Sequence, residues 1–477
     1  MKLINLPKSI FHVAERLEKN DFEAYLVGGS VRDILLGKEP KDYDITTSAT
    51  PEEVMNIFPT SVPTGIKFGT VTVLLDPNDG LDEVQITTFR SEKEYIASRW
   101  PSHVEFTRSL DEDLKRRDFT INAFAIRLID ISQYDALTQE LFFDYLIDLF
   151  DGENDLKNKL IKAVGNPDER FQEDALRMLR ACRLASCLSF KIEKNTFESI
   201  LRNVELVKNL SIERVRDEFI KLIEESPKPS YGIELLRETG ILQIFIPELL
   251  EGYGMKHNRY HVDNIYDHYL RTLDIAPIEI RFAALFHDIG KPRTKDGEHF
   301  YGHDKVGAEM TKSILTRLKF PKNQIEKITN LVRWHMFYIP TDGDVKDEKT
   351  KRNESFMRGW SDAAIRRFVN KVGGYENFDD LIKLRISDAL ANPHRSFNPE
   401  DVIRLSKRVA ELKEQDALFK LKDLKVNGDD LKELGLKGKS IGEMLGYLYE
   451  IVVEDPSKNQ REILLDIVKQ KIDQQSI

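Results

Sequence analysis

Two aspartates, Asp42 and Asp44, follow a double-glycine turn and are well suited to phosphate chemistry. The segment YLVGGSVRD predicts a strand that ends at Gly28-Gly29 and a helix that begins at Ser30. Glycine lets a phosphate approach the backbone, and a helix N-terminus offers free N–H groups. Two nearby carboxylates are the donors that a pair of Mg²⁺ ions needs to assist in-line displacement at phosphorus. For either half alone, a plain turn or a solvated pair of acids is the alternative.

A second group of candidate residues is rich in histidine. Seven of the ten histidines lie within 79 residues, between positions 257 and 335. The motif RFAALFHDIGKP has an apolar helix pattern that ends in a His-Asp pair, and such a pair is costly to bury unless it is paired or binds metal. The residues with suitable ligand types for one or two transition metals are His268, His287, Asp288, His303, His335 and Asp388, with His299 as an alternative to His303.

Short strands and one short helix must position the aspartates. Runs of β-branched and aromatic residues predict strands at 23–27, 43–47, 69–75 and 83–89, with a helix at 31–36. Period two along the second strand would place Asp42 and Asp44 on one face, beside the glycine turn. Thr50-Pro51-Glu52-Glu53 has the form of a helix start with a capping box. After about residue 150 the pattern becomes helical almost throughout, so we expect an α+β fold.

Composition excludes several classes of protein. The chain has 477 residues, of which 41% are hydrophobic and 32% charged, and this balance is typical of a folded protein of several domains. No apolar run approaches the ~20 residues that span a bilayer, and the N-terminus lacks the pattern of a signal peptide. Two cysteines in so long a chain indicate a reducing, cytoplasmic setting. The net charge of −10 argues against non-specific coating of nucleic acid but leaves room for a local basic groove.

The motifs together resemble a known family. VGGSVRD followed by DYD resembles the nucleotidyltransferase signature of the DNA polymerase β superfamily. More narrowly, it resembles that of class II tRNA nucleotidyltransferases (CCA-adding enzymes) and bacterial poly(A) polymerases. RRDFTINAFAI, RFQEDALRMLRACR, SIERVRDEF and DLKVNGDDLKELG resemble further motifs of this family, in the family's order. The resemblance implies a polymerase-β-like head (a small mixed sheet with helices) at 1–150 and an all-α neck that binds RNA at 151–245. An HD domain at 246–395 and a helical tail at 396–477 would follow.

The resemblance also implies roles for residues of the head and neck. Asp42 and Asp44 would hold two catalytic Mg²⁺ ions, and Gly28, Gly29 and Arg32 would contact the triphosphate. Asp118 would lie near the ribose 2′-hydroxyl, with Arg117 and Asn122 supporting the nucleotide. Asp174 and Arg177, expected three apart on one helix, would read the Watson–Crick edge of CTP or ATP. Without the family pattern, an ordinary helix salt bridge would explain that last pair equally well.

The neck carries a surplus of arginine. RFQEDALRMLRACR has four positive and two negative charges, and a tRNA acceptor end could lie along its phosphate-binding side chains. We name Arg170, Arg180 and Arg183 as candidate RNA-binding residues. A salt-bridged helix is the alternative for each of them.

Three features depart from the family pattern. Gln85 stands where the family usually has Glu, a possible third acid near the metals, and Glu83 could replace it. Ala97 and Ser98 stand where many members have Asp-Gly in a loop that helps the switch from CTP to ATP. An insertion at 131–145 has no assigned role.

The histidine cluster resembles the HD phosphohydrolase superfamily, whose ligands follow the order H…HD…H…H…D. The resemblance implies hydrolysis of a phosphoester by metal-activated water, with Lys291 supporting the phosphate. The metal would be a transition metal or Mg²⁺. A structural remnant that has lost catalysis is the alternative.

We therefore expect a CCA tRNA nucleotidyltransferase that adds C, C and A to tRNA from CTP and ATP without a nucleic-acid template and releases pyrophosphate. A membrane or an obligate protein partner is not expected. An A-adding enzyme and a poly(A) polymerase remain open as alternatives. From a different class, so does an HD phosphohydrolase whose head recruits RNA. A non-catalytic RNA-binding protein fits less well, because two sets of metal-binding residues are complete.

Overall fold

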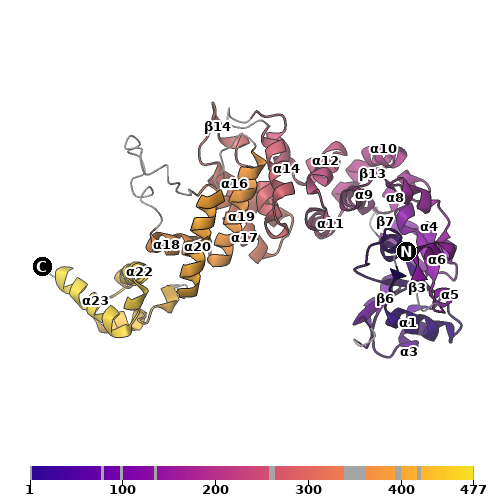
Figure 1. The fold of residues 1–477 in the computed structure, drawn as a ribbon, viewed down its shortest axis with the longest axis horizontal. Coiled ribbons are helices and arrows are strands. Elements are labelled where there is room, and N and C mark those ends of the chain that lie inside the picture. The colour runs from indigo at the N-terminus through magenta and orange to yellow at the C-terminus, as the bar shows by residue number, and fades with distance from the viewer. Residues whose placement is uncertain are drawn as a thin grey trace. The chain divides into compact units, whose positions relative to one another are not determined.

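The computed structural model of the chain describes residues 3–76, 80–96, 100–133, 137–256, 264–337, 361–392, 399–415 and 421–475 (Figure 1). The chain divides into two compact units, Met1–Pro247 and Glu248–Ile477. Each is described by itself. Our finer division into head, neck, HD domain and tail stays a prediction.

The N-terminal unit is built on a mixed sheet of seven strands. Their order is β11-β9-β2-β3-β6-β5-β4. β3 and β6 run parallel, and the other neighbours are antiparallel. The strands are β2 (Ala24–Val27), β3 (Asp44–Thr47), β4 (Ser61–Gly65), β5 (Thr70–Leu74), β6 (Glu83–Thr88), β9 (Phe124–Arg127) and β11 (Ile147–Asp148). A separate antiparallel pair is formed by β7 (Arg90–Ile96) and β8 (Trp100–Phe106).

Short helices connect these strands. They are α1 (Lys8–Glu18), α2 (Gly29–Leu35), α3 (Pro51–Ile57), α4 (Leu110–Lys115), α5 (Leu128–Ile131), α6 (Gln139–Asp144) and α7 (Gly152–Lys157). The predicted capping box is confirmed: the Thr50 side chain accepts from Glu53 N–H, and the Glu53 carboxylate accepts from Thr50 N–H. Beside the sheet, Tyr25 and Val27 of β2 pack in one buried cluster with Phe89, Leu114 and Ala125. This cluster joins β2 to the end of α4, just before the Arg-Arg-Asp motif.

Two short strand pairs complete the β structure of this unit: β1 (Leu3–Ile4) with β10 (Leu137–Thr138), antiparallel, and β12 (Leu160–Ile161) with β13 (Lys191–Ile192), parallel. The rest of the unit is mainly helical. Its helices are α8 (Pro167–Glu173), α9 (Leu176–Leu188), α10 (Lys194–Asn203), α11 (Ile212–Glu225), α12 (Pro229–Glu238) and α13 (Ile241–Phe245). Small residues allow close contact between some of them: a Cβ on Gly232 of α12 would lie 2.8 Å from the side chain of Leu222 in α11.

The C-terminal unit is also helical. Its helices are α14 (Ile265–Ile275), α15 (Arg281–Phe286), α16 (His303–Arg317), α17 (Lys322–Trp334), α18 (Asp362–Val372), α19 (Tyr375–Ala391), α20 (Pro399–Gln415), α21 (Gly428–Glu433), α22 (Lys439–Glu454) and α23 (Arg461–Gln475). A small hairpin, β14 (Lys295–Asp296) and β15 (His299–Phe300), precedes α16. α21, α22 and α23 share a buried apolar cluster centred on Leu448 and Val452. Within the described residues, we find no helix both long and apolar enough to cross a bilayer.

The observed α+β fold confirms the predicted fold class, and the four predicted strands match the structure to within a residue or two. The prediction that Asp42 and Asp44 lie on one face of the same strand is wrong, because β3 begins at Asp44 and Asp42 lies two residues before it. Sequence reasoning also missed β9, whose first three residues are buried beside β2. A strand of only four residues is too short to show a clear alternation of apolar and polar residues.

Candidate active site and metal centre

The glycine turn brings together three predicted site residues. Gly28 has φ +75°, and a Cβ at this position would stand 3.0 Å from Arg117 Nη1 and 3.9 Å from Asp44 Oδ2. Val27 and Asp44 are direct partners between β2 and β3, so the acid begins its strand where the turn begins. The turn is held by the Ser30 hydroxyl, which donates to the carbonyl of Val27 at 2.7 Å. Gly28, Asp44 and Arg117 therefore converge on one point.

The two aspartates influence each other electrostatically. The surrounding protein removes part of the hydration of Asp44 and raises the pKa of its carboxyl, Arg117 opposes this shift, and the charge of Asp42 adds to it. Gln85 is paired with Asp44 in the parallel ladder of β3 and β6 and projects from the same face. Glu83 lies two residues before Gln85 on that face and is also exposed. Ala97 and Ser98 lie outside the described residues.

A chain of hydrogen bonds connects the residues predicted to bind the triphosphate and the ribose. Arg32 Nη1 donates to Asn122 Oδ1 at 2.7 Å, and Asn122 Nδ2 donates to Asp118 Oδ1 at 3.2 Å. Arg32 is also fixed by Asp33, which accepts from its Nε at 2.9 Å. Gly29 lies beside this arginine, because a Cβ on Gly29 would be 3.4 Å from Arg32 Nη2.

Asp113 is a residue of this site that sequence reasoning missed. Its side chain is fully buried, and it accepts from Arg116 Nε at 3.0 Å and from Arg117 Nη2 at 3.3 Å. Burial alone would raise the pKa of Asp113, but Arg116 and Arg117 outweigh it and the pKa is lowered. The sequence feature that could have identified Asp113 is its spacing from Arg116 and Arg117. Asp113 lies three and four residues before these arginines, on a short helix that ends at Lys115.

Asp174 and Arg177, the pair predicted to read the base, do not lie on one continuous helix. Asp174 ends α8 in an extended conformation (φ −145°, ψ 103°), and its Oδ1 accepts from Leu176 N–H at 3.1 Å, so a new helix starts behind it. Arg214 of α11 donates to both carboxylate oxygens, Nη1 to Oδ1 at 3.2 Å and Nη2 to Oδ2 at 2.6 Å. Arg177 is buried and donates to Glu173 Oε2 at 2.6 Å and to the carbonyl of Arg116 at 2.8 Å.

The three arginines predicted to bind RNA each have an acidic partner inside the unit. Arg170 pairs with Glu173 and also donates to the carbonyl of Lys115 at 3.2 Å. Arg180 Nε donates to Asp118 Oδ2 at 2.7 Å, and Arg183 Nε donates to Glu218 Oε2 at 2.6 Å.

One of these ion pairs has a large effect on the predicted ribose-binding acid. Burial would raise the pKa of Asp118, but Arg180 outweighs it and lowers the pKa to about 2. Arg180 also lies 3.6 Å from Glu218 Oε1. Asp118, Arg180, Glu218 and Arg183 therefore form a continuous charged network from the Arg-Arg-Asp motif to α11.

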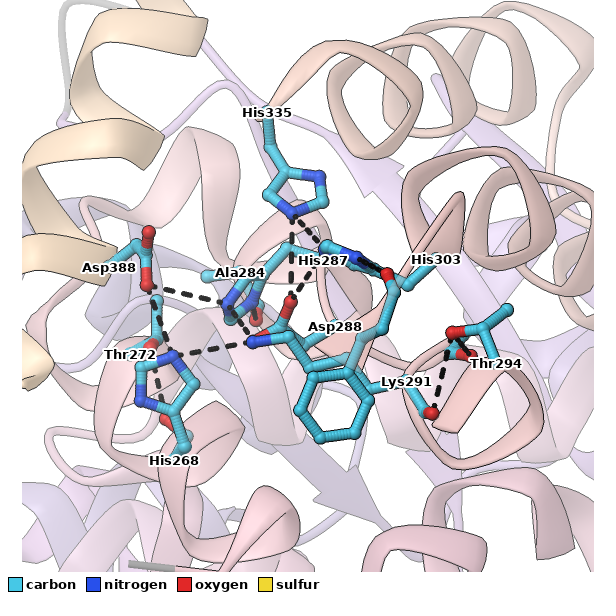
Figure 2. A network of polar contacts seen from close by, with 12 residues as sticks. His268, Thr272, Ala284, His287, Asp288, Lys291, Thr294, His303, His335 and Asp388 are labelled. Carbon is cyan, nitrogen blue, oxygen red and sulfur yellow. Dashed lines mark hydrogen bonds and ion pairs between the residues drawn. The ribbon is translucent and has the colours of Figure 1, made fainter. Parts of the chain in front are cut away.

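In the C-terminal unit the six predicted metal ligands come together (Figure 2). They form two triads, and the ligand atoms within each triad lie within 4.8 Å of one another. Every member is buried. One triad is His268, His287 and Asp388, and the other is Asp288, His303 and His335.

The local fold explains how these ligands point inward. Nδ1 of His287, His303 and His335 lies 2.8, 2.7 and 2.7 Å from a backbone carbonyl three residues earlier, which leaves each Nε2 to face the centre. Asp288 stands between the triads: its Oδ2 is 3.2 Å from His287 Nε2, and its Oδ1 is 3.4 Å from His303 Nε2. Gly290 allows the close approach of α16, since a Cβ there would be 2.3 Å from the carbonyl of His303.

Electrostatics couple the members of this cluster. Burial would raise the pKa of Asp288, but His287 and Lys291 outweigh it and hold the pKa well below its ordinary value. Burial lowers the pKa of His335, which favours the neutral imidazole that binds metals. Lys291 pairs with Asp288, as Figure 2 shows. The alternative ligand His299 is exposed and stacks on Tyr301 with ring centroids 5.1 Å apart.

Family models match three parts of the chain. A poly A polymerase head domain matches residues 24–162, a probable RNA- and SrmB-binding site of polymerase A matches 189–252, and an HD domain matches 248–418.

Named relatives and a solved structure agree with these family models. A CCA-adding enzyme of Lactobacillus helveticus is 51% identical over 210 residues, which span 44% of this chain and 48% of that relative. A CCA-adding enzyme of Ligilactobacillus salivarius is 34% identical over 98% of both chains. The crystal structure of the Bacillus stearothermophilus CCA-adding enzyme in complex with CTP matches 99% of this chain and all of its own, with a TM-score of 0.68 and 26% identity. The chain thus belongs to the CCA-adding enzyme family.

Proposed function

We propose that the protein is a tRNA nucleotidyltransferase that adds C, C and A to the 3′ end of tRNA, using CTP and ATP without a nucleic-acid template. The full-length similarity to a CCA-adding enzyme supports this activity over A-only addition or poly(A) synthesis. The observation that carries the proposal is the convergence of Gly28, Asp44 and Arg117 at the start of β3. A reaction between tRNA, CTP and ATP would take place in the cytoplasm.

The proposed roles follow from the contacts. Gly28, Gly29 and Arg32 would bind the triphosphate, while Arg117, Asp118 and Asn122 would hold the sugar. Asp174, which lies between α8 and α9, and Arg177, in the first turn of α9, would read the base. The tRNA 3′-hydroxyl would attack the α-phosphorus, and pyrophosphate would leave as the P–O bond opposite to the attacking oxygen breaks.

Asp42 and Asp44 suit Mg²⁺, because both offer hard carboxylate oxygens and their mutual repulsion would be relieved by cations. Two Mg²⁺ ions would supply charge neutralisation for the attacking and leaving oxygens. The chain's own residues position the phosphates and the base, and this positioning is a large part of catalysis in such reactions.

The test uses three tRNA transcripts, ending at the discriminator base, at C and at CC, incubated with Mg²⁺ and CTP, ATP or both. Stepwise growth that stops at CCA, and is absent in Asp44→Ala, is expected. Addition of A to the CC-ended transcript alone would indicate an A-adding enzyme, and an unlimited A ladder a poly(A) polymerase. If no transcript grows, the proposal is wrong.

For the C-terminal unit we propose a centre for two divalent metal ions that hydrolyses a phosphoester. The donor set fits transition metals, with four imidazoles and two carboxylates in two buried triads. His268, His287 and Asp388 would hold one ion, and Asp288, His303 and His335 would hold the other. Lys291 would hold a substrate phosphate.

The test is metal titration of chelator-treated protein with Mn²⁺, Co²⁺, Ni²⁺ or Zn²⁺, followed by hydrolysis of bis-p-nitrophenyl phosphate. Two ions per chain are expected, with one lost in His268→Gln and one in His303→Gln. His299→Gln serves as the matched control, because this exposed histidine belongs to neither triad. Unchanged stoichiometry in both ligand variants would contradict the proposal.

A further inference from the structure

The carboxylate of Asp174 is held by donors that leave part of it open. Its Oδ1 accepts from Leu176 N–H at 3.1 Å and from Arg214 Nη1 at 3.2 Å. Its Oδ2 accepts from Arg214 Nη2 at 2.6 Å. A carboxylate has about four lone-pair positions, two on each oxygen. Oδ1 has therefore used both of its positions, and Oδ2 has one position left for a further donor.

Arg214 has a particular place in this arrangement. Leu176 N–H comes from the same turn as Asp174 and contacts one oxygen only. Arg214 comes from α11, 40 residues away, and binds both oxygens in the parallel two-pronged geometry that a guanidinium forms with a carboxylate. The Leu176 contact allows the carboxylate plane to turn about one oxygen, whereas the two-pronged contact fixes the plane and decides which oxygen stays open.

This open position can discriminate between nucleobases. Cytosine and adenine each carry an exocyclic amino group, which donates hydrogen bonds, while uracil and guanine carry a carbonyl at the corresponding place. A fixed carboxylate oxygen accepts from the amino group and repels the carbonyl oxygen. The side chains of Arg214 and Asp174 are 31% and 22% exposed, so the pair lies at a surface that a nucleotide can reach.

We infer that Arg214 is a positioning residue for nucleotide selection: it orients Asp174 so that Oδ2 accepts the amino group of CTP or ATP and excludes UTP and GTP. The inference rests on the proposed function, in which Asp174 faces the base. Arg214 itself need not touch the nucleotide, and its effect passes through the carboxylate.

The experiment measures kcat and KM for single-nucleotide addition of CTP and of UTP to a tRNA transcript that ends at the discriminator base. The full-length variants are Arg214→Gln, Arg214→Lys and Asp174→Ala. Arg216→Gln is the matched control, since Arg216 lies on the same helix and pairs with its neighbour Asp217. Thermal unfolding of every variant reports whether it is folded.

We expect Arg214→Gln to lower the ratio of kcat/KM for CTP to that for UTP by about tenfold or more, which corresponds to about 1.4 kcal/mol. Arg214→Lys should restore part of the ratio, because an ammonium keeps the charge but loses the two-pronged geometry. Arg216→Gln should leave the ratio unchanged. A merely structural role would lower the rates for CTP and UTP together.

Two results would overturn the inference. If Arg214→Gln and Arg214→Lys both keep the wild-type ratio while Asp174→Ala loses it, Asp174 reads the base without help from Arg214. If Asp174→Ala also keeps the ratio, base reading by Asp174 fails as well, and the proposed function must be revised at that residue. Should Arg214→Gln unfold, the ratio in Arg214→Lys decides alone, because its charge still compensates Asp174.

Discussion

Replacement of Gly28 by alanine should damage nucleotide binding more than it damages folding. Gly28 has φ +75° and ψ −137°, a backbone conformation that residues with a Cβ rarely adopt. Strain of this kind costs about 1–3 kcal/mol. The new Cβ would also stand 3.0 Å from Arg117 Nη1, which is closer than normal contact. The guanidinium would have to move away from the carbonyl of Asn122 and from Asp113, with a loss of about 1 kcal/mol for each weakened hydrogen bond.

A matched glycine separates these two effects. Gly165 also has a positive φ, +66°, but a Cβ there would meet nothing within 4 Å. Gly165→Ala should therefore lower the free energy of unfolding by about 1–2 kcal/mol through the backbone alone. The affinity for CTP should not change, because no side chain of the candidate site is displaced.

The assay combines calorimetric titration of CTP with denaturant unfolding of both variants. We expect Gly28→Ala to bind CTP at least about tenfold more weakly, the equivalent of about 1.4 kcal/mol, because Arg117 is displaced. Equal CTP affinity in Gly28→Ala and wild type would refute the reasoning. So would an equal loss of affinity in Gly165→Ala, since strain without a clash would then be sufficient.

Three further predictions concern stability. Asp118→Asn should lower the free energy of unfolding by about 2 kcal/mol at pH 7, because the pKa of Asp118 is depressed from 3.8 to about 2. This contribution is complete above the unfolded pKa and disappears as pH falls through the folded one, so denaturant unfolding at pH 3 should show about half the difference. Chelation of bound metal should lower the unfolding temperature of the C-terminal unit, with Asp288→Ala insensitive to chelator in the same thermal scan. Leu448→Ala should cost about 3 kcal/mol in denaturant unfolding because Leu448 is fully buried, whereas Leu421→Ala, at a side chain 49% exposed, should cost less than about 1 kcal/mol; equal losses would contradict this view of the cluster.

The charged network around Asp118 connects α2 to α9 and α11 within the N-terminal unit. Arg32 is linked through Asn122 to Asp118, and Asp118 is linked through Arg180 to Glu218 of α11. Arg32 and Glu218 are therefore joined by one connected set of side chains. This continuity is a reason to measure binding and selectivity together in variants of either part.

Much of the local structure could be predicted from sequence, because its causes lie within a few residues. The capping box at Thr50 depends on residues three apart, and short runs of β-branched residues predict the strands. His287 and Asp288 could be predicted as metal ligands because a polar pair at the end of an apolar helix is costly to bury. The other four predicted ligands were named from their residue types and from the resemblance to the HD superfamily. Their assembly into two triads depends on tertiary structure, because they come from five helices: the first turns of α14 and α16, the residues just after α15 and α17, and the last turn of α19.

Tertiary structure decided which partner each charge has. Arg180 and Arg183 appear in the sequence as a basic strip, but Asp118 and Glu218, 62 and 35 residues away, pair with them in the folded unit. The pairing of Asp174 with Arg214 was hidden for the same reason, since a helix pattern carries no information about a donor on another helix. Local periodicity reports which residues are apolar and how they repeat. The choice among many arginines and acids depends on how distant elements pack, because a buried charge takes whichever opposite charge the fold brings within reach.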